Sequence, residues 1–268
     1  MKKFIIFIIV LGCALNLPAQ VVFKASVFGC MSDGITVNTN SIQTAINTIS
    51  ERGGGSLHFY VGRYLTGTVY LKNNVTIVLH EGATLVGVPS AYDYSAPAGG
   101  KKGIIVAEGQ FNIGVTGDLP EYPATPPAVA PEIVGMGVIQ GWGAKVQQSV
   151  AVQREKGYLK GSEEDALPAL ISFAGCTNVN VSGLDLQGAA GDVLVFTGCK
   201  DLTVKNHLIS SIEVAGSDGV VFSGCDGLTV TNNFFNVSGT AFKSANNSKG
   251  VKTDGNKSKK GLLPKVTK

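Results

Sequence analysis

The sequence has few charges and lacks the patterns that mark several common classes of protein. Charged residues make up 15% of its 268 residues. No two of its cysteines stand in a C-x-x-C pair, which argues against a zinc ribbon. The apolar run from Phe4 to Leu11 is too short to span a membrane. Glycine is abundant instead, with 35 residues, and this composition favours short strands joined by tight turns around one sizeable core.

Residues 1–19 have the pattern of a secretory signal peptide. Two lysines precede the apolar run, and Leu17-Pro18-Ala19 supplies a small residue for cleavage. A second interpretation stays open, because Val10-Leu11-Gly12-Cys13 resembles a lipobox that would anchor the protein through a lipid on Cys13. Both interpretations predict an exported protein, periplasmic or extracellular.

Residues 249–268 form a basic segment that carries seven lysines and one aspartate. Binding of nucleic acid is one interpretation of such a segment. The segment lacks arginine and aromatic residues, however, so we expect a solvated, flexible tail and no nucleic-acid partner.

An internal repeat occupies the centre of the chain. The segment that begins with Phe173 and contains Cys176 recurs at Phe196 and Phe222, at offsets of 23 and 26 residues, with a weaker echo at Phe242. Periods of this length predict a solenoid whose equal positions form columns of touching side chains. A leucine-rich repeat is the alternative, but its leucine spacing and asparagine column are absent.

The cysteines of the repeat fall in one such column, at Cys176, Cys199 and Cys225. Metal ligation is the alternative to a core position, but stacked thiols are more often small apolar core residues. Three thiols in register also leave disulfide pairing incomplete, so we predict buried free thiols and no metal site.

One short helix and two insertions interrupt the strand pattern. Asn38-Thr39-Asn40 can cap a helix over residues 39–50, in which Ile42, Ala45, Ile46 and Ile49 share one face. Residues 118–131 are rich in proline and residues 145–166 are polar, and both segments are expected to be loops. Insertions of this kind on a solenoid often line a binding cleft, although a plain solvated loop is the alternative.

A series of ordered motifs lies between residues 21 and 245: Val27–Gly34, Gly53–Gly55, Gly62–Thr68, Leu71–Thr76, Glu81–Leu85, Tyr92–Tyr94, Asn112–Gly117 and Gly137–Gly141. Together they resemble the polygalacturonase-like glycoside hydrolases of family 28, which are pectin lyase-like proteins. The resemblance implies an all-β fold, a right-handed, single-stranded parallel β-helix over residues 20–248 with the 39–50 helix as its N-terminal cap. It locates a scaffold rather than a catalyst.

The family resemblance also implies hydrolysis of α-1,4-linked galacturonan by paired aspartates, without a cofactor. The family's Asn-Thr-Asp-Gly motif falls on Gly216–Gly219, which keeps its aspartate as Asp218. The family's two further aspartates fall on Asn236–Ser238 and are missing, and no counterpart of its His or Arg/Lys motifs follows residue 245. Asp218 is therefore the predicted catalytic residue, and Ser217, Ser238 and Lys243 are predicted to bind substrate.

Asp192 is the candidate partner of Asp218. Both lie seven residues before a cysteine of the repeat, which places them in one column with Ala169 and Ser238. Carboxylates on adjacent coils, about 4.8 Å apart, would form an acid/base pair with separated pKa values. The alternative is an exposed aspartate pair relieved by a lysine or a bound cation.

The sequence thus predicts a hydrolase of galacturonan or pectin whose activity is in doubt, with an acidic polysaccharide as its partner. Two alternatives stay open: a non-catalytic carbohydrate-binding β-helix, and the truncated product of a longer pectinase gene. Because an end coil exposes unpaired strand edges, self-association through the C-terminal coil is also expected.

Overall fold

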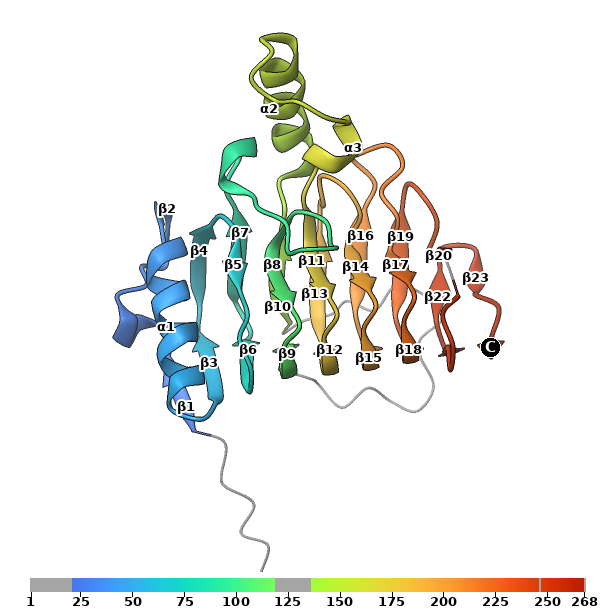
Figure 1. Cartoon of the computed structure of the whole chain (residues 1–268), viewed down its shortest axis with the longest axis horizontal. Coiled ribbons are helices and arrows are strands. Elements are labelled where there is room, and N and C mark those ends of the chain that lie inside the picture. The colour runs from blue at the N-terminus through green and yellow to red at the C-terminus, as the bar shows by residue number, and fades with distance from the viewer. Residues whose placement is uncertain (1–20, 119–135, 246, 268) are drawn as a thin grey trace, which may run out of the picture.

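The computed structural model describes residues 21–118, 136–245 and 247–267, and these wind into a right-handed parallel β-helix as the sequence predicted (Figure 1). Successive coils add strands to three sheets, which we call A, B and C; sheets A and B have nine strands each and sheet C has six. Pairing is parallel throughout, except that β23 and β24 pair antiparallel with β22 and β21.

Sheet A consists of β1 (Val22–Lys24), β3 (Gly55–Phe59), β6 (Val75–Leu79), β9 (Phe111–Gly117), β12 (Thr177–Ser182), β15 (Lys200–Lys205), β18 (Asp226–Thr231), β21 (Lys252–Asp254) and β24 (Val266–Thr267). Sheet B consists of β2 (Asp33–Val37), β4 (Gly62–Thr66), β7 (Ala83–Gly87), β10 (Gly137–Gln140), β13 (Leu184–Gln187), β16 (Leu208–Ser211), β19 (Phe234–Val237), β22 (Lys257–Ser258) and β23 (Gly261–Leu262). Sheet C consists of β5 (Val69–Tyr70), β8 (Gly103–Glu108), β11 (Ala169–Ala174), β14 (Leu194–Thr197), β17 (Val220–Ser223) and β20 (Phe242–Ala245).

The predicted aromatic column is present in sheet C. Phe173 pairs in register with Phe196, and Phe196 with Phe222. The weaker echo does not extend this column, because Phe222 pairs with Ser244 and Phe242 pairs with Val220. The Phe242 ring instead lies against Phe235, with the ring centroids 5.0 Å apart.

The cysteine column is confirmed as buried and free. Cys176, Cys199 and Cys225 are at most 1% exposed, and none forms a disulfide. Their sulfurs lie near backbone carbonyls such as Phe173 O, 3.5 Å from Cys199 Sγ. The thiols therefore serve as small core side chains.

Asparagine columns form at the turns, although the sequence analysis found none. Asn74, Asn112 and Asn178 adopt positive φ angles of 60°, 52° and 53°, and their side-chain amides bond from coil to coil at 2.9 and 2.7 Å. A second, buried column runs from the turn residue His207 through Asn233 to Asn256. Irregular spacing along the chain concealed both columns.

Helix α1 (Thr39–Glu51) covers the N-terminal end of the coils, as predicted (Figure 1). Its apolar face is fully buried, whereas the expected side-chain cap is absent. Asn38 uses its side chain to hold Met31 instead, accepting from Met31 N at 2.7 Å and donating to Met31 O at 2.9 Å.

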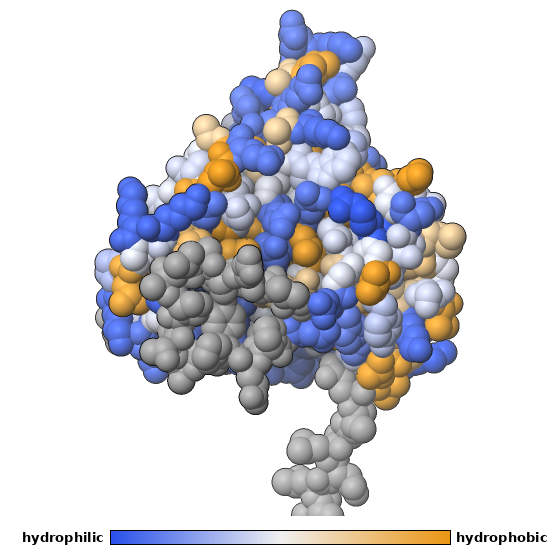
Figure 2. Space-filling view, turned by 180° about the vertical axis from the view of Figure 1, so that it is seen from behind, coloured by the Kyte–Doolittle hydropathy of each residue, from blue (hydrophilic) through white to orange (hydrophobic). Residues whose placement is uncertain are grey.

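The insertion over residues 145–166 is helical and not the expected loop. It contains most of α2 (Gly143–Glu155) and all of α3 (Glu163–Ala166), which project from the coils (Figure 1). Val146 and Val150, one turn apart, are fully buried and anchor α2, yet the rest of the helix is too polar for its periodicity to stand out. The face of this projection seen in Figure 2 is mostly hydrophilic. The short 3₁₀ helices are η1 (Ala25–Phe28) and η2 (Ala91–Asp93).

The expected flexible tail after residue 249 is likewise replaced by regular structure. Strands β21 to β24 continue sheets A and B, with Val251, Thr253 and Asn256 buried and Lys252 exposed. The charge count suggested solvation, but the lysines occupy outward positions of an alternating pattern. The predicted signal peptide, Cys13 and residues 119–131 of the first insertion lie outside the described residues. No helix in the part of the chain that the structure describes is long and apolar enough to cross a membrane.

Candidate functional site

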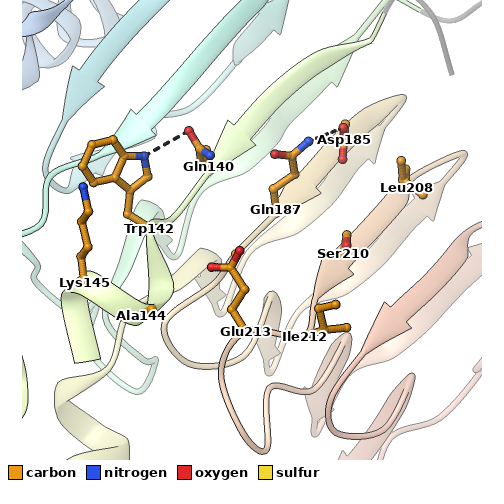
Figure 3. A pocket seen from close by; sticks show the side chains of 11 residues that line it. Gln140, Trp142, Ala144, Lys145, Asp185, Gln187, Leu208, Ser210, Ile212 and Glu213 are labelled. Atoms are coloured by element: carbon orange, nitrogen blue, oxygen red, sulfur yellow. Dashed lines mark hydrogen bonds between the residues drawn. The ribbon is translucent and has the colours of Figure 1, made fainter. Parts of the chain in front are cut away.

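A cavity of about 600 Å³ lies over sheet B, beside the start of α2, and we call it the sheet cavity. Strands β10, β13 and β16 supply its floor, and the turn after β16 supplies one wall (Figure 3). Its lining residues are Gln140, Trp142, Ala144, Lys145, Asp185, Gln187, Gly188, Leu208, Ser210, Ile212 and Glu213.

The floor of the sheet cavity is an outward-facing polar column. Gln140 pairs in register with Gln187, and Gln187 with Ser210. Asn236 continues the column on β19 and donates to Ser210 Oγ at 3.3 Å. Amide and hydroxyl groups at one strand spacing offer hydrogen bonds of the kind that sugar hydroxyls need.

Trp142 stands at the edge of this floor. Its αL conformation, with φ 51° and ψ 42°, places it before the first residue of α2, and its Nε1 donates to Gln140 Oε1 at 3.1 Å. Lys145 Nζ lies 3.6 Å from the centroid of the indole ring. Gly143 permits this turn, since a Cβ there would clash with Ala189 O. The cavity therefore combines an aromatic face with a cation.

Two carboxylates in different environments face the sheet cavity. Burial raises the pKa of Asp185 above its ordinary value, against the opposing hydrogen bond from Gln187. Gln187 Nε2 donates to Asp185 Oδ2 at 2.6 Å, while Asp185 Oδ1 is buried and has no hydrogen-bond partner among the described residues. Glu213 is exposed and extends from its turn toward the strands of the floor (Figure 3). Two carboxylates that reach one cavity from different environments are the residue types that acid/base hydrolysis requires.

Asp192 lines a second cavity of about 330 Å³, which we call the turn cavity. Lys101, Lys243 and Ser217 also line it, together with residues of α2 and α3. Lys101 Nζ lies 3.2 Å from Asp192 Oδ2 and 2.8 Å from Glu164 Oε1. Burial opposes the charge of Lys101, but these two carboxylates raise its pKa above the ordinary value. The second insertion thus lines both cavities.

Asp218 is buried beside Asp192 but does not line either cavity. Its Oδ1 accepts from Thr240 N at 2.7 Å and Thr240 Oγ1 at 2.9 Å, and its Oδ2 lies 2.9 Å from Lys243 Nζ. Burial alone would raise its pKa, but the hydrogen bonds from Thr240 and the ion pair with Lys243 hold the pKa below the ordinary value. The Asp218 carboxylate is therefore ionised at neutral pH, and both of its oxygens already have protein partners.

The aspartates are adjacent, as the column predicted, but they are neither exposed nor unpaired. Asp218 N donates to Asp192 Oδ1 at 3.3 Å, and each carboxylate has its own lysine. The column does not continue through Ser238, because Val220 pairs with Phe242 and Asp218 therefore lies opposite Thr240. The prediction failed there because the next turn is shorter.

The hydroxyl groups of Ser217 and Ser238 form hydrogen bonds with backbone groups. Ser217 Oγ donates to Gly191 O at 2.7 Å and bonds Ser211 Oγ at 2.9 Å. Ser238 Oγ accepts from Ser217 N at 3.1 Å and donates to Val214 O. Lys243 is exposed, with its side chain 55% accessible.

The sequence analysis missed Asp185 and Gln187, although a signal was present. Leu184-Asp185-Leu186-Gln187 alternates apolar and polar residues, which in a strand places both polar side chains on the outer face. The predicted site residues lie near the family motif, at the turns and on sheet C, and none of them lies on a strand of sheet B.

The fold and the cavity define the class first: this is a right-handed parallel β-helix protein with a polar cavity over one sheet. Residues 129–249 match the sequence profile of Glycosyl hydrolases family 28. A proposed glycosyl hydrolase from Parabacteroides merdae ATCC 43184 is similar at 36% identity and a TM-score of 0.80, over 92% of this chain and 100% of that chain. The chain belongs to glycosyl hydrolase family 28.

Other relatives are longer than this chain. An exo-poly-alpha-D-galacturonosidase from Dickeya chrysanthemi is 37% identical over 73 residues, which are 27% of this chain and 12% of that protein. The family 28 exopolygalacturonase from Yersinia enterocolitica has the same fold at 19% identity and a TM-score of 0.68, over 90% of this chain and 49% of that chain. The chain thus spans about an eighth of the first relative and half of the second.

Proposed function

We propose that the protein is an exported glycoside hydrolase that binds an acidic, galacturonan-type polysaccharide in the sheet cavity. The observation that carries the proposal is the meeting of two carboxylates, Asp185 and Glu213, with the indole of Trp142 in one cavity of about 600 Å³. The cavity is large enough for sugar rings, which stack on aromatic faces and bond to amides and hydroxyls.

In the proposed reaction Asp185 is the general acid and Glu213 is the general base. Asp185 gives its proton to the glycosidic oxygen, and Glu213 takes a proton from the water that attacks the anomeric carbon. The bond from carbon to the leaving oxygen breaks as the bond to water forms, so the leaving sugar keeps the proton of Asp185. The raised pKa of Asp185 supports the acid role.

Lysines near both cavities support an acidic substrate. Lys145 lies at the sheet cavity, and Lys101 and Lys243 line the turn cavity. Val214 of the turn cavity directly follows Glu213 of the sheet cavity. We propose that Lys243 binds a uronate carboxylate of a polysaccharide that extends from one cavity to the other. Asp192 and Asp218 then position the lysines, and Ser217 and Ser238 hold the turn.

The test is release of new reducing ends from polygalacturonate by wild type, Asp185→Asn and Glu213→Gln. We expect a loss of at least about 100-fold in kcat for each variant, with the fold intact by circular dichroism. Asp192→Asn serves as the comparison for the turn cavity: we expect it to keep most of kcat and to raise KM, because Asp192 positions Lys101. Loss in Asp192→Asn with full activity in Asp185→Asn would move the reaction to the turn cavity.

A non-catalytic carbohydrate-binding protein is the second candidate. It is favoured by the occupied state of Asp218, the one catalytic aspartate that the family resemblance assigns. Such a protein would be retarded on a polygalacturonate affinity gel, release no reducing ends, and lose retardation in Trp142→Ala.

A further inference from the structure

Two histidines on the outer face of sheet A lie in direct contact, far from both cavities in the sequence. His58 is on β3 and His80 follows β6. Their facing nitrogens, His58 Nδ1 and His80 Nε2, are 2.7 Å apart, and the ring centroids are 4.9 Å apart. Neither cavity includes these residues, and the proposed hydrolysis does not use them.

The outward nitrogens of both rings are held by oxygen groups. His58 Nε2 lies 2.7 Å from Ser56 Oγ, and His80 Nδ1 lies 2.7 Å from Asp118 Oδ2. Asp118 is itself fixed by Glu81 N, which donates to its Oδ2 at 3.3 Å. Metal-binding imidazoles are oriented in this way, because a carboxylate or hydroxyl on one nitrogen fixes the tautomer and aims the other nitrogen at the ion.

We propose that His58 Nδ1 and His80 Nε2 bind one divalent transition-metal ion, Zn²⁺ or Cu²⁺, with water molecules as its other ligands. No group of three or more His, Cys, Asp and Glu ligands occurs in the described ranges, so the described residues supply these two ligands. Imidazole is a preferred ligand of both ions, and the general order of affinities places Cu²⁺ above Zn²⁺.

Metal binding here requires one tautomer change and no net loss of protons. Without metal, one proton lies between the facing nitrogens. With metal, the His58 proton moves to Nε2 and is donated to Ser56 Oγ, while His80 keeps its proton toward Asp118. Two nitrogens on a tetrahedral ion are roughly 3.3 Å apart, so the rings must separate by about 0.6 Å, which a small χ2 rotation supplies.

The surroundings permit access to the pair. The side chains of His80 and Asp118 are 24% and 48% exposed. The Tyr60 ring stacks on the His80 ring, with the ring centroids 4.5 Å apart. Lys24, 5.8 Å from the Tyr60 ring, is the nearby cation that opposes metal binding.

The test is calorimetric titration of the untagged protein with ZnCl₂ and, separately, CuSO₄ at pH 7.5. We expect binding of one ion, tighter for Cu²⁺ than for Zn²⁺, and a loss of at least 10-fold in affinity in His58→Gln and in His80→Gln. Asp118→Asn should weaken binding about 10-fold to 100-fold, and Lys24→Gln should tighten it. Unchanged binding in both histidine variants would overturn the proposal.

Electron paramagnetic resonance of the wild type with Cu²⁺ keeps the test decisive if a variant fails to fold. The chain has three histidines, and His207 is 1% exposed, so coupling to two imidazole nitrogens identifies the pair. Absence of nitrogen coupling overturns the proposal without any variant. Neither measurement depends on hydrolysis of polysaccharide. Failure of the proposed hydrolase function would therefore leave the test of the metal site unaffected.

Discussion

Substitution of Asp218 by asparagine tests whether this carboxylate stabilises the fold. The side chain is 7% exposed and accepts two hydrogen bonds from Thr240 and one ion pair from Lys243. Asparagine keeps an acceptor for Thr240, but it loses the charge and turns an amide toward the lysine. Hydrogen bonds to a charged group contribute about 1.5–3 kcal/mol, so we expect Asp218→Asn to lower the free energy of unfolding by about 2 kcal/mol.

The control variant separates the hydrogen bonds from the ion pair. Lys243 is 55% exposed and can turn to water, so Lys243→Gln should cost less than about 1 kcal/mol. In a thermal melt at pH 7 we expect Asp218→Asn to lower Tm by roughly 4–8 °C and Lys243→Gln by much less. The reasoning fails if Asp218→Asn melts with the wild type or if Lys243→Gln is the more damaging change.

The pH dependence of this difference has a definite sign. The folded-state pKa of Asp218 lies below its ordinary value, so the folded protein favours the ionised form. The stabilisation is therefore complete above the unfolded pKa, about 3.9, and is lost as the pH falls through the lower folded pKa. Urea titrations of wild type and Asp218→Asn should stay apart at pH 5 to 8, begin to converge below about pH 4, and coincide only below the folded-state pKa.

Four further results are expected. Asp185→Asn should keep wild-type stability at pH 7 in urea titration, because burial already opposes the ionised form of this carboxylate; a large loss would contradict the raised pKa. Phe196→Ala should cost about 3–5 kcal/mol, since its ring is fully buried between Phe173 and Phe222, whereas Phe111→Ala, at a side chain 45% exposed, should cost far less. The four buried thiols should react with a thiol reagent only after unfolding, and fast reaction of the native protein would exclude a closed core; they are Cys30, Cys176, Cys199 and Cys225. We also expect concentration-dependent self-association by light scattering, through the outer edge of β20 and the exposed Leu262; a monomer at high concentration would count against it.

The coil architecture was predictable because stacking converts sequence period into spatial columns. The repeat at Phe173, Phe196 and Phe222 gave the correct register without any tertiary information. The same logic failed for Phe242 and Ser238, where the turn between coils changes length. The motif fixed the neighbours where both its phenylalanine and its cysteine recurred, even at unequal offsets of 23 and 26 residues. Ala245 occupies the cysteine position after Phe242, and the register there differs by two residues.

The helical insertion and the C-terminal coil were not predictable, for a different reason. Both are polar segments that depend on a few buried residues, such as Val146 and Val150 in α2 and Asn256 in the last coil. Their stability comes from the columns and surfaces on which they pack, and average composition does not record that contribution. The sheet cavity was not predictable for the same reason. Trp142 and Glu213 are brought to the cavity of Asp185 by the packing of the start of α2 and of the turn after β16.

The position of Asp218 explains why a family motif can persist in part without marking an active site. Asp218 joins three successive coils, because its backbone N donates to Asp192 Oδ1 in the coil before and its carboxylate binds Thr240 and Lys243 in the coil after. Loss of the carboxylate leaves Thr240 and Lys243 without their shared partner, so folding alone is sufficient to retain it. Presence of Asp218 is consequently weak evidence for catalysis in this chain. The carboxylates that can decide the question are the two that reach the sheet cavity, Glu213 and Asp185, of which Asp185 has a raised pKa.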